Sequence, residues 1–289
     1  MSFFLISYEG LLNFEKRSLI TFFEILLPIS YFWTIWVYAK AFFSNNQLAE
    51  KLKTPLLLVT LLLHAAYIII RTSVFGHPPI TSIFEILTLI AFMVLVVYAY
   101  IELRTKNSST GYFILILPFF FQLVSSGFIH ENSEIAPALR SALLGFHVSS
   151  ALLGYTAITI SAVYGFLYLM LYHDIKSNRF GVIYKRLPNL EMLERMSFVS
   201  TIFGFVFLTI AITIGIIWLP RVFVSISYAD PKLLGTFIIW LMYGGGLVAK
   251  KVAGWSGRRM VVLSMFGFAL AMFSMTIINM FFSEFHKFY

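Results

Sequence analysis

Eight apolar stretches, each long enough to cross a lipid bilayer, constrain this 289-residue chain more than any other feature. A transmembrane helix needs about 20 mainly apolar residues. Backbone amides cannot be hydrated inside a bilayer, so each stretch must pair its own backbone groups as a helix. The sequence therefore predicts an all-α, polytopic membrane protein with about eight transmembrane helices, at residues 19–42, 55–75, 80–103, 111–129, 141–172, 196–219, 232–250 and 260–283.

Composition agrees with a single membrane domain. Hydrophobic residues make up 60% of the chain and charged residues only 12%, whereas a soluble protein of this size keeps a large polar shell. Residues 19–289 are therefore predicted to form one transmembrane domain. Residues 1–18 mix apolar and charged side chains, so we expect this segment to lie along the membrane interface. It lacks the apolar core and small-residue cleavage site of a signal peptide.

The distribution of basic residues predicts the orientation in the membrane. The net charge is +8, but Lys and Arg lie mainly between the apolar stretches, which favours a topological role over nucleic-acid binding. Eight spans place both termini on one side. The loops of the opposite side carry 14 of the 21 basic residues. The positive-inside rule places that side in the cytoplasm and both termini outside.

Histidines are the chemically informative residues. The chain has no cysteine, which excludes disulfides, thiolate metal sites and cysteine nucleophiles. No catalytic triad, carboxylate pair or His/carboxylate metal spacing lies on one outward face, so no catalytic residue is assigned. Two outward histidines on separate spans, His147 and His286, flank the tryptophan-bearing segment from Trp218 to Trp240. This combination is typical of a haem with two axial histidine ligands and aromatic walls.

Several other polar residues have both a structural and a functional interpretation. His64 lies close to the bilayer centre, where a histidine either bonds to neighbouring helices or marks a ligand site. His77 precedes two prolines in an outward loop, as a solvated residue or as part of the site. Glu24 is expected to make a structural hydrogen bond, while Arg71 either meets an anionic group or extends to the lipid headgroups. Ser82 and Glu85 form a capping box that opens the third span.

Several motifs resemble the CcsA/HemX branch of the cytochrome c assembly protein family, the haem-handling membrane proteins of system II cytochrome c maturation. The resemblance spans about residues 55–289. The segment from Gly76-His77-Pro78-Pro79 to Glu85 is similar to that family's Gly-His-x-Pro segment, and residues 254–259 are similar to its Gly-Trp-x-Gly-Arg-Arg turn. His147, followed by Leu153-Gly154-Tyr155, resembles the helix with the first external haem ligand, and His286 matches the position of the second.

The same resemblance extends to the tryptophan-rich WWD segment of the family. Trp218, Asp230-Pro231-Lys232 and Trp240 fall in register with it. The chain departs from the pattern at its internal tryptophans, at a glutamate that has become Leu233, and at an intramembrane histidine that has become Val248. The residues that replace the internal tryptophans are Phe223, Ser227, Ala229 and Gly235.

The resemblance implies a haem-binding membrane component of cytochrome c biogenesis, which holds haem b at the outer face for delivery or attachment to apocytochrome c. It implies a CcsB/ResB-like membrane partner, and any enzymatic role would belong to a thioether-forming complex. His147 and His286 would be the metal ligands, and His64 a second, intramembrane ligand that replaces the histidine missing at Val248. The porphyrin would be bordered by Trp218, Asp230, Trp240 and His77.

Two other functions are considered. One is a HemX-like, non-catalytic regulator or scaffold of haem biosynthesis, which the substituted tryptophans favour and the retained pair of external histidines opposes. The other is a transporter that uses Glu24, His64 and Arg71 as an intramembrane pathway. We find no inverted repeat and no pair of interrupted helices that would support a transporter.

Overall fold

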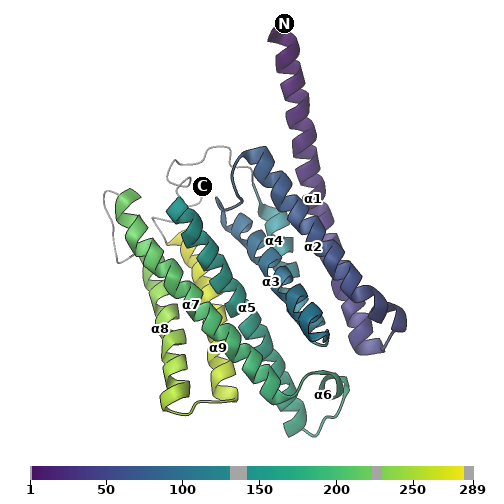
Figure 1. Ribbon diagram of the computed structural model, residues 1–289, viewed down its shortest axis with the longest axis vertical. Coiled ribbons are helices and arrows are strands. Elements are labelled where there is room, and N and C mark those ends of the chain that lie inside the picture. Colours follow the sequence, from purple (N-terminus) through teal and green to yellow (C-terminus); the bar gives the residue numbers. More distant parts are fainter. Residues whose placement is uncertain (1, 131–141, 223–229, 283–289) are drawn as a thin grey trace.

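The computed structural model describes residues 2–130, 142–222 and 230–282, and this part of the chain consists of helices joined by short links (Figure 1). Eight helical segments are long and apolar enough to cross a membrane, as predicted. Seven of them lie within α1 (Ser2–Ser44), α2 (Gln47–Phe75), α3 (Ile83–Thr105), α4 (Gly111–Phe128), α5 (Ala142–Lys176), α7 (Leu190–Val222) and α8 (Pro231–Val252), and the eighth, Arg258–Ile278, consists of α9 (Arg258–Phe273) and the π-helical turn that follows it. The short elements are α6 (Val182–Arg186), the π-helical turn η2 (Ser274–Ile278) and α10 (Asn279–Phe281).

Local signals set several helix ends. Helix α2 begins after Asn46, whose side chain accepts a hydrogen bond from the backbone N–H of Ala49, and ends at Gly76. Gly76 has a φ of 73°, a left-handed conformation that glycine adopts without steric cost. Asp230 precedes α8, and Pro231 occupies its first position, where no backbone N–H is needed. These residues therefore set both ends of α2 and the start of α8.

Helix α5 is the centre of the structure. It packs most extensively along α7 and also contacts α9 and α3, while α1–α4 form a second group of neighbouring helices. Small residues bring α5 and α7 close together. A Cβ atom added at Gly204 of α7 would lie 2.8 Å from Ile158 of α5, and one added at Gly154 would lie 3.2 Å from Leu208. This close packing holds the side chains of α5 in a fixed position relative to α7.

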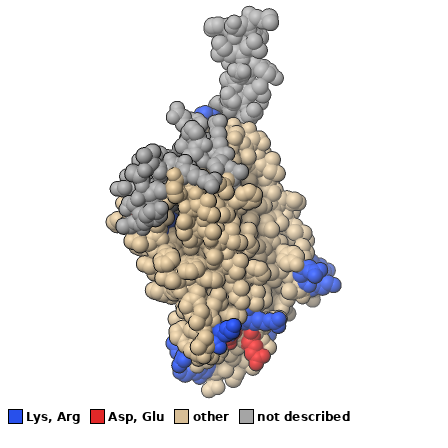
Figure 2. Space-filling model, turned by 60° about the vertical axis from the view of Figure 1, so that its left-hand side comes forward, with Lys and Arg blue, Asp and Glu red and all other residues tan. Residues whose placement is uncertain are grey.

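The two ends of the bundle differ in charge. On the face shown in Figure 2, Lys and Arg gather toward one end and leave a broad uncharged zone. The connection α5–α7 and the connection α8–α9 lie at that end, opposite the point where α7 leads into α8 (Figure 1). The strongly basic loops α5–α7 and α8–α9 therefore lie at the end of the bundle opposite the less basic loops, as the sequence predicts. Their assignment to the cytoplasmic and outer sides stays a prediction.

Helix α1 is longer than the first predicted span. It begins at Ser2, runs without interruption to Ser44, and extends beyond the other helices at its N-terminal end (Figure 1). Residues 2–18 are therefore a continuation of the first span and share its helix. An interfacial location for residues 1–18 stays a prediction, as does the single domain over residues 19–289.

Candidate functional site

His147 lies near the N-terminal end of α5, where it contacts α7. Its Nδ1 atom is 2.8 Å from the backbone carbonyl oxygen of Ala211. A carbonyl oxygen only accepts hydrogen bonds, so Nδ1 carries the proton and the neutral ring keeps its lone pair on Nε2. The ring also lies against Gly215, where an added Cβ would be 3.1 Å from Cε1. Helix α7 thus fixes both the orientation and the tautomer of His147.

Trp240 lies beside this region, at the contact between α7 and α8. Its indole N–H donates a 2.7 Å hydrogen bond to the hydroxyl of Thr209, two residues before Ala211. The indole stacks on two phenylalanine rings, with centroid distances of 5.5 Å to Phe205 and 5.7 Å to Phe237. Trp240 is therefore a fixed aromatic side chain between α7 and α8. Its partner Thr209 lies two residues, about half a helical turn, from Ala211, whose carbonyl binds His147.

Trp218 and Asp230 lie at the ends of α7 and α8 nearest His147. Trp218 is half-buried on the last turns of α7, three residues after Gly215. Asp230 is buried, and its carboxylate accepts a 2.7 Å hydrogen bond from the backbone N–H of Lys232, which caps α8. The structure thus brings His147, Trp218, Asp230 and Trp240 to the same region, formed by α5, α7 and α8. His286 and residues 223–229 lie outside the described residues.

His64 is a fully buried member of a hydrogen-bonded chain between α1, α2, α3 and α4. Its Nδ1 is 3.0 Å from the hydroxyl of Tyr31, and its Nε2 is 3.0 Å from the hydroxyl of Thr88. Thr88 donates in turn to Gln122, and Gln122 to Ser126. Both ring nitrogens have partners, so an iron ligand at His64 would first have to break one of these bonds. The contacts favour the structural interpretation of His64.

His77 is also buried, which makes the interpretation as a solvated loop residue wrong. Its exposed fraction is 8%, its Nδ1 lies 2.8 Å from the carbonyl oxygen of Pro78, and its ring tilts against Phe75. These contacts belong to the link between α2 and α3. No contact between His77 or His64 and the His147 region is found among the described residues.

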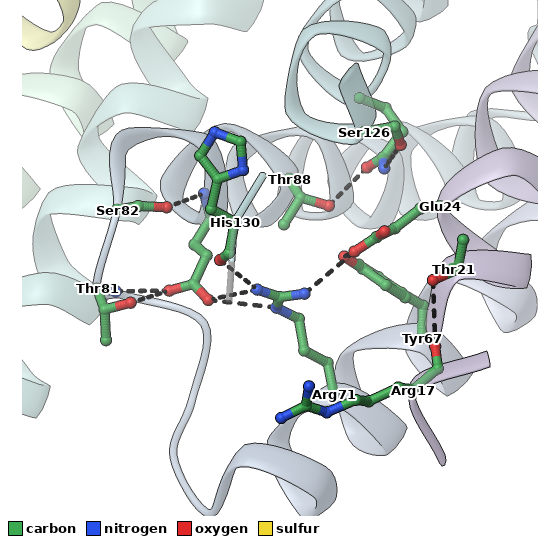
Figure 3. A network of polar contacts seen from close by, with 12 residues as sticks. Arg17, Thr21, Glu24, Tyr67, Arg71, Thr81, Ser82, Thr88, Ser126 and His130 are labelled. Atoms are coloured by element: carbon green, nitrogen blue, oxygen red, sulfur yellow. Dashed lines mark hydrogen bonds and ion pairs between the residues drawn. The ribbon is translucent and has the colours of Figure 1, made fainter. Parts of the chain in front are cut away.

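A buried ionic cluster joins α1, α2 and α3 (Figure 3). Arg71 is 2% exposed and lies between two carboxylates, 2.9 Å from Glu85 and 3.1 Å from Glu24. It also donates to the carbonyl oxygen of His130 at 3.3 Å. Of the two alternatives for Arg71, the contact with anionic groups is the one found. Glu24 makes the structural bonds expected of it, including one from the hydroxyl of Tyr67.

Half of the predicted capping box is found at Ser82 and Glu85, because the Glu85 carboxylate bonds to the N–H of Thr81 where the motif would use that of Ser82. The Ser82 hydroxyl accepts from the backbone N–H of Glu85 at 3.1 Å, as predicted. The Glu85 carboxylate binds Arg71 and both the N–H and the hydroxyl of Thr81, at 2.7 and 2.8 Å. Glu85 therefore has a second structural role, as the buried counter-ion of Arg71.

Metal-ligating side chains do not cluster in the described part of the chain. No three side chains from His, Cys, Asp and Glu converge within residues 2–130, 142–222 and 230–282.

Comparison with known proteins identifies the family. The sequence model of the cytochrome c assembly protein family matches residues 30–286, which is most of the chain. The chain belongs to the cytochrome c assembly protein family. Membership supports a role in cytochrome c biogenesis, and the eight apolar helices agree with a multi-pass integral membrane protein. Cytochrome c assembly brings haem and apocytochrome c together, so this role implies an involvement with both.

Individual relatives are similar to this chain over two thirds or more of its length. The cytochrome c biogenesis protein CcsA of Prochlorococcus marinus (strain MIT 9301) is 28% identical over 292 aligned positions, which cover 92% of this chain and 89% of the relative. Protein HemX of Bacillus subtilis (strain 168) is 24% identical over 232 residues, 80% of this chain and 84% of the relative. The CcsA protein of Chlorella vulgaris is 27% identical over 225 residues, 67% and 71% of the two chains.

Proposed function

We propose that this protein holds haem b at the end of the bundle where α7 leads into α8, and passes it to the attachment of haem to apocytochrome c. His147 and His286 would be the axial ligands, with Trp218, Asp230 and Trp240 at the border of the porphyrin. The site would face the outer side of the bacterial cytoplasmic membrane, beside a CcsB/ResB-like partner. His64 and His77 belong to the other group of helices, where their hydrogen bonds give them a structural role.

The observation that carries the proposal is the hydrogen bond between His147 and Ala211. Metal-binding histidines usually donate their second ring N–H to a carbonyl or carboxylate, which fixes the ring and makes the ligating nitrogen more basic. The 2.8 Å bond from Nδ1 to the Ala211 carbonyl oxygen is of this kind and leaves Nε2 as the ligating atom. Trp240 and its stacked phenylalanines supply the apolar surface that a porphyrin needs.

When bound, haem supplies the iron centre and the vinyl groups that apocytochrome thiols attack. The residues of the chain would bind and orient it. His147 would fix one face of the ring through a rigid imidazole, and the neighbouring aromatic side chains would exclude water. The proposed task is to hold and present haem, and the partner would complete the attachment.

An optical spectrum is the direct test of the proposal. The protein purified in detergent, or reconstituted with added haem, is expected to show a Soret band and, after reduction, the sharp visible bands of iron with two imidazole ligands. A protein that neither carries haem nor binds added haem would contradict the proposal. A haem spectrum of five-coordinate iron would retain haem binding and reject the second axial ligand.

A valine at Gly215 is expected to weaken haem binding without removing a ligand. The first added carbon would already lie 3.1 Å from the ring of His147, so the branched side chain must displace the ring from the Ala211 carbonyl. Loss of such a supporting hydrogen bond usually costs about 10- to 100-fold in metal affinity. Haem titrations of Gly215→Val and of Gly245→Val, where an added Cβ meets open space, would check the effect. Equal affinities in the two variants would contradict it.

A regulator or scaffold of haem biosynthesis, as in a HemX-like protein, is the second candidate. It is supported by the substituted tryptophans of the segment between Trp218 and Trp240 and by the similarity to Protein HemX. Cytochrome c maturation in a deletion strain supplied with haem separates the two functions. A haem-presenting component should remain necessary under these conditions, whereas a pure regulator should become dispensable.

A further inference from the structure

Lys232 places a cationic group beside His147 that the proposed axial ligation does not use. It lies in the first turn of α8, and its ammonium nitrogen donates a 3.2 Å hydrogen bond to the backbone carbonyl of Ser274. Both residues lie toward the end of the bundle at which α7 ends and α8 begins, since His147 packs against Ala211 and Gly215 of α7. The Lys232 side chain is only partly exposed, so the charge lies at the site itself and not in free solvent.

The charge of Lys232 is incompletely neutralised by the described part of the chain. An ammonium group has three N–H donors, and one is directed at Ser274. Asp230 attracts the charge from a distance, but its carboxylate bonds to the backbone N–H of Lys232. Among residues 2–130, 142–222 and 230–282, no carboxylate forms an ion pair with the ammonium nitrogen. A partly buried cation without an ion pair is costly unless an anion joins it.

The π-helical turn η2, which contacts the start of α8, includes a buried hydroxyl group without a hydrogen-bond partner among the described residues. Ser274 begins the π-helical turn η2, and its carbonyl accepts from Lys232. Its hydroxyl is buried, has no hydrogen-bond partner among the described residues, and lies against α8, 2.9 Å from a Cβ added at Gly235. Single π-helical turns within α-helices are frequent at functional sites. Lys232 and Ser274 together therefore offer N–H and O–H donors at the contact between α8 and η2.

We infer that Lys232 binds a propionate carboxylate of the haem that His147 would hold, with the Ser274 hydroxyl as a neighbouring donor. This inference rests on the proposed function. Haem carries two propionates, so a haem bound at His147 brings anionic groups to a region where the described charges include an incompletely neutralised cation. A lipid phosphate near the membrane surface has similar chemistry, and the test must distinguish the two.

The test compares haem with haem dimethyl ester, in which both propionates are esterified and uncharged. Each ligand is titrated into the full-length protein in a phospholipid-free, uncharged detergent, and the dissociation constant is read from the Soret band. Charge-assisted hydrogen bonds are strong enough that the wild type is expected to bind haem roughly 10-fold more tightly than the ester, or better. Lys232→Met is expected to bind both ligands with the affinity of the ester, and Lys232→Arg to keep the preference. Lys251→Met, at the exposed opposite end of α8, is the matched control.

Each other outcome overturns a defined part of the argument. A wild type that binds haem and its ester equally, in a His147-dependent way, overturns the role of Lys232 and leaves the haem site in place. This arm needs no Lys232 variant, so it holds even if Lys232→Met fails to fold. A preference for haem that survives in Lys232→Met assigns the propionate to another residue. If Lys232→Met binds vesicles rich in anionic phospholipid more weakly than the wild type does, and its haem affinity is unchanged, Lys232 is assigned to lipid. A wild type that binds neither ligand overturns the proposed function itself.

Discussion

Replacement of His147 with alanine is expected to remove the low-spin haem spectrum and to lower haem affinity by roughly two orders of magnitude, equivalent to about 2.7 kcal/mol. The imidazole would be a direct ligand of the iron, and the Ala211 carbonyl already holds it in the required tautomer. His286→Ala is expected to act on the same spectrum, because it would remove the second ligand. The measurement is the Soret and visible absorption of the purified variants in the oxidised and reduced states.

His173→Ala is the matched control for His147→Ala. His173 lies on the same helix, in the last turn of α5 at the opposite end, and is exposed. This variant should leave the spectrum unchanged. Imidazole added to His147→Ala should restore six-coordinate iron, since a free ligand can enter the space that the side chain leaves. An unaltered spectrum in His147→Ala, or a loss of haem that imidazole does not reverse, would remove His147 from the ligand set.

The number of helices could be predicted from the sequence because hydropathy and length alone decide whether a segment spans a bilayer. The helix ends could not all be predicted in this way. Helix α7 begins at Leu190, six residues before the apolar stretch, since its first turns carry charged residues that a hydropathy pattern reads as loop. Glu194 in these turns forms an ion pair with Lys250 of α8 at 3.2 Å. Such an end is stabilised by a contact between helices, which no local pattern reveals.

The side chains of the candidate site could be chosen from the sequence, but their backbone partners could not. His147, Trp218, Asp230 and Trp240 follow from motif register, and their role in holding haem stays a prediction. The Ala211 carbonyl that orients His147 has no sequence signature, because every residue has a carbonyl. Gly215 could have been noticed only as a small residue four positions further along α7. The partners of His64 were missed because they come from two other helices, α1 and α3, and their pairing depends on helix rotation.

The same reasoning applies to polar residues that stabilise the first group of helices. Glu102 of α3 accepts hydrogen bonds from the hydroxyls of Tyr38 on α1 and Tyr98 on α3, each at 2.6 Å. The sequence shows an acidic residue near the end of an apolar stretch, which equally fits a solvated position. Only the arrangement of α1 and α3 distinguishes the two. The role of a buried polar group in a membrane bundle is therefore established by its hydrogen-bond partner, which the sequence alone does not identify.

The largest expected loss of stability comes from replacing Arg71 with methionine. The guanidinium group is buried between Glu24 and Glu85, which are 18% and 1% exposed, so its removal leaves a buried carboxylate without its counter-ion. Removing one partner of a buried ion pair typically costs about 3–5 kcal/mol. The free energy of unfolding, measured by SDS titration of the protein in mixed micelles, should fall by this amount. Arg104→Met, at an exposed position on α3, should have little effect.

A second substitution separates the lost ion pair from lost packing. In Arg71→Met/Glu85→Gln, the uncharged amide oxygen can still accept from Thr81, as the carboxylate does at 2.7 and 2.8 Å. The double variant is therefore expected to be more stable than Arg71→Met, and the two single effects should not add, as in a double-mutant cycle for groups in contact. Additive effects would mean that Arg71 stabilises the bundle mainly through contacts other than its ion pair with Glu85, such as its guanidinium group over the Phe75 ring, 4.8 Å from the centroid.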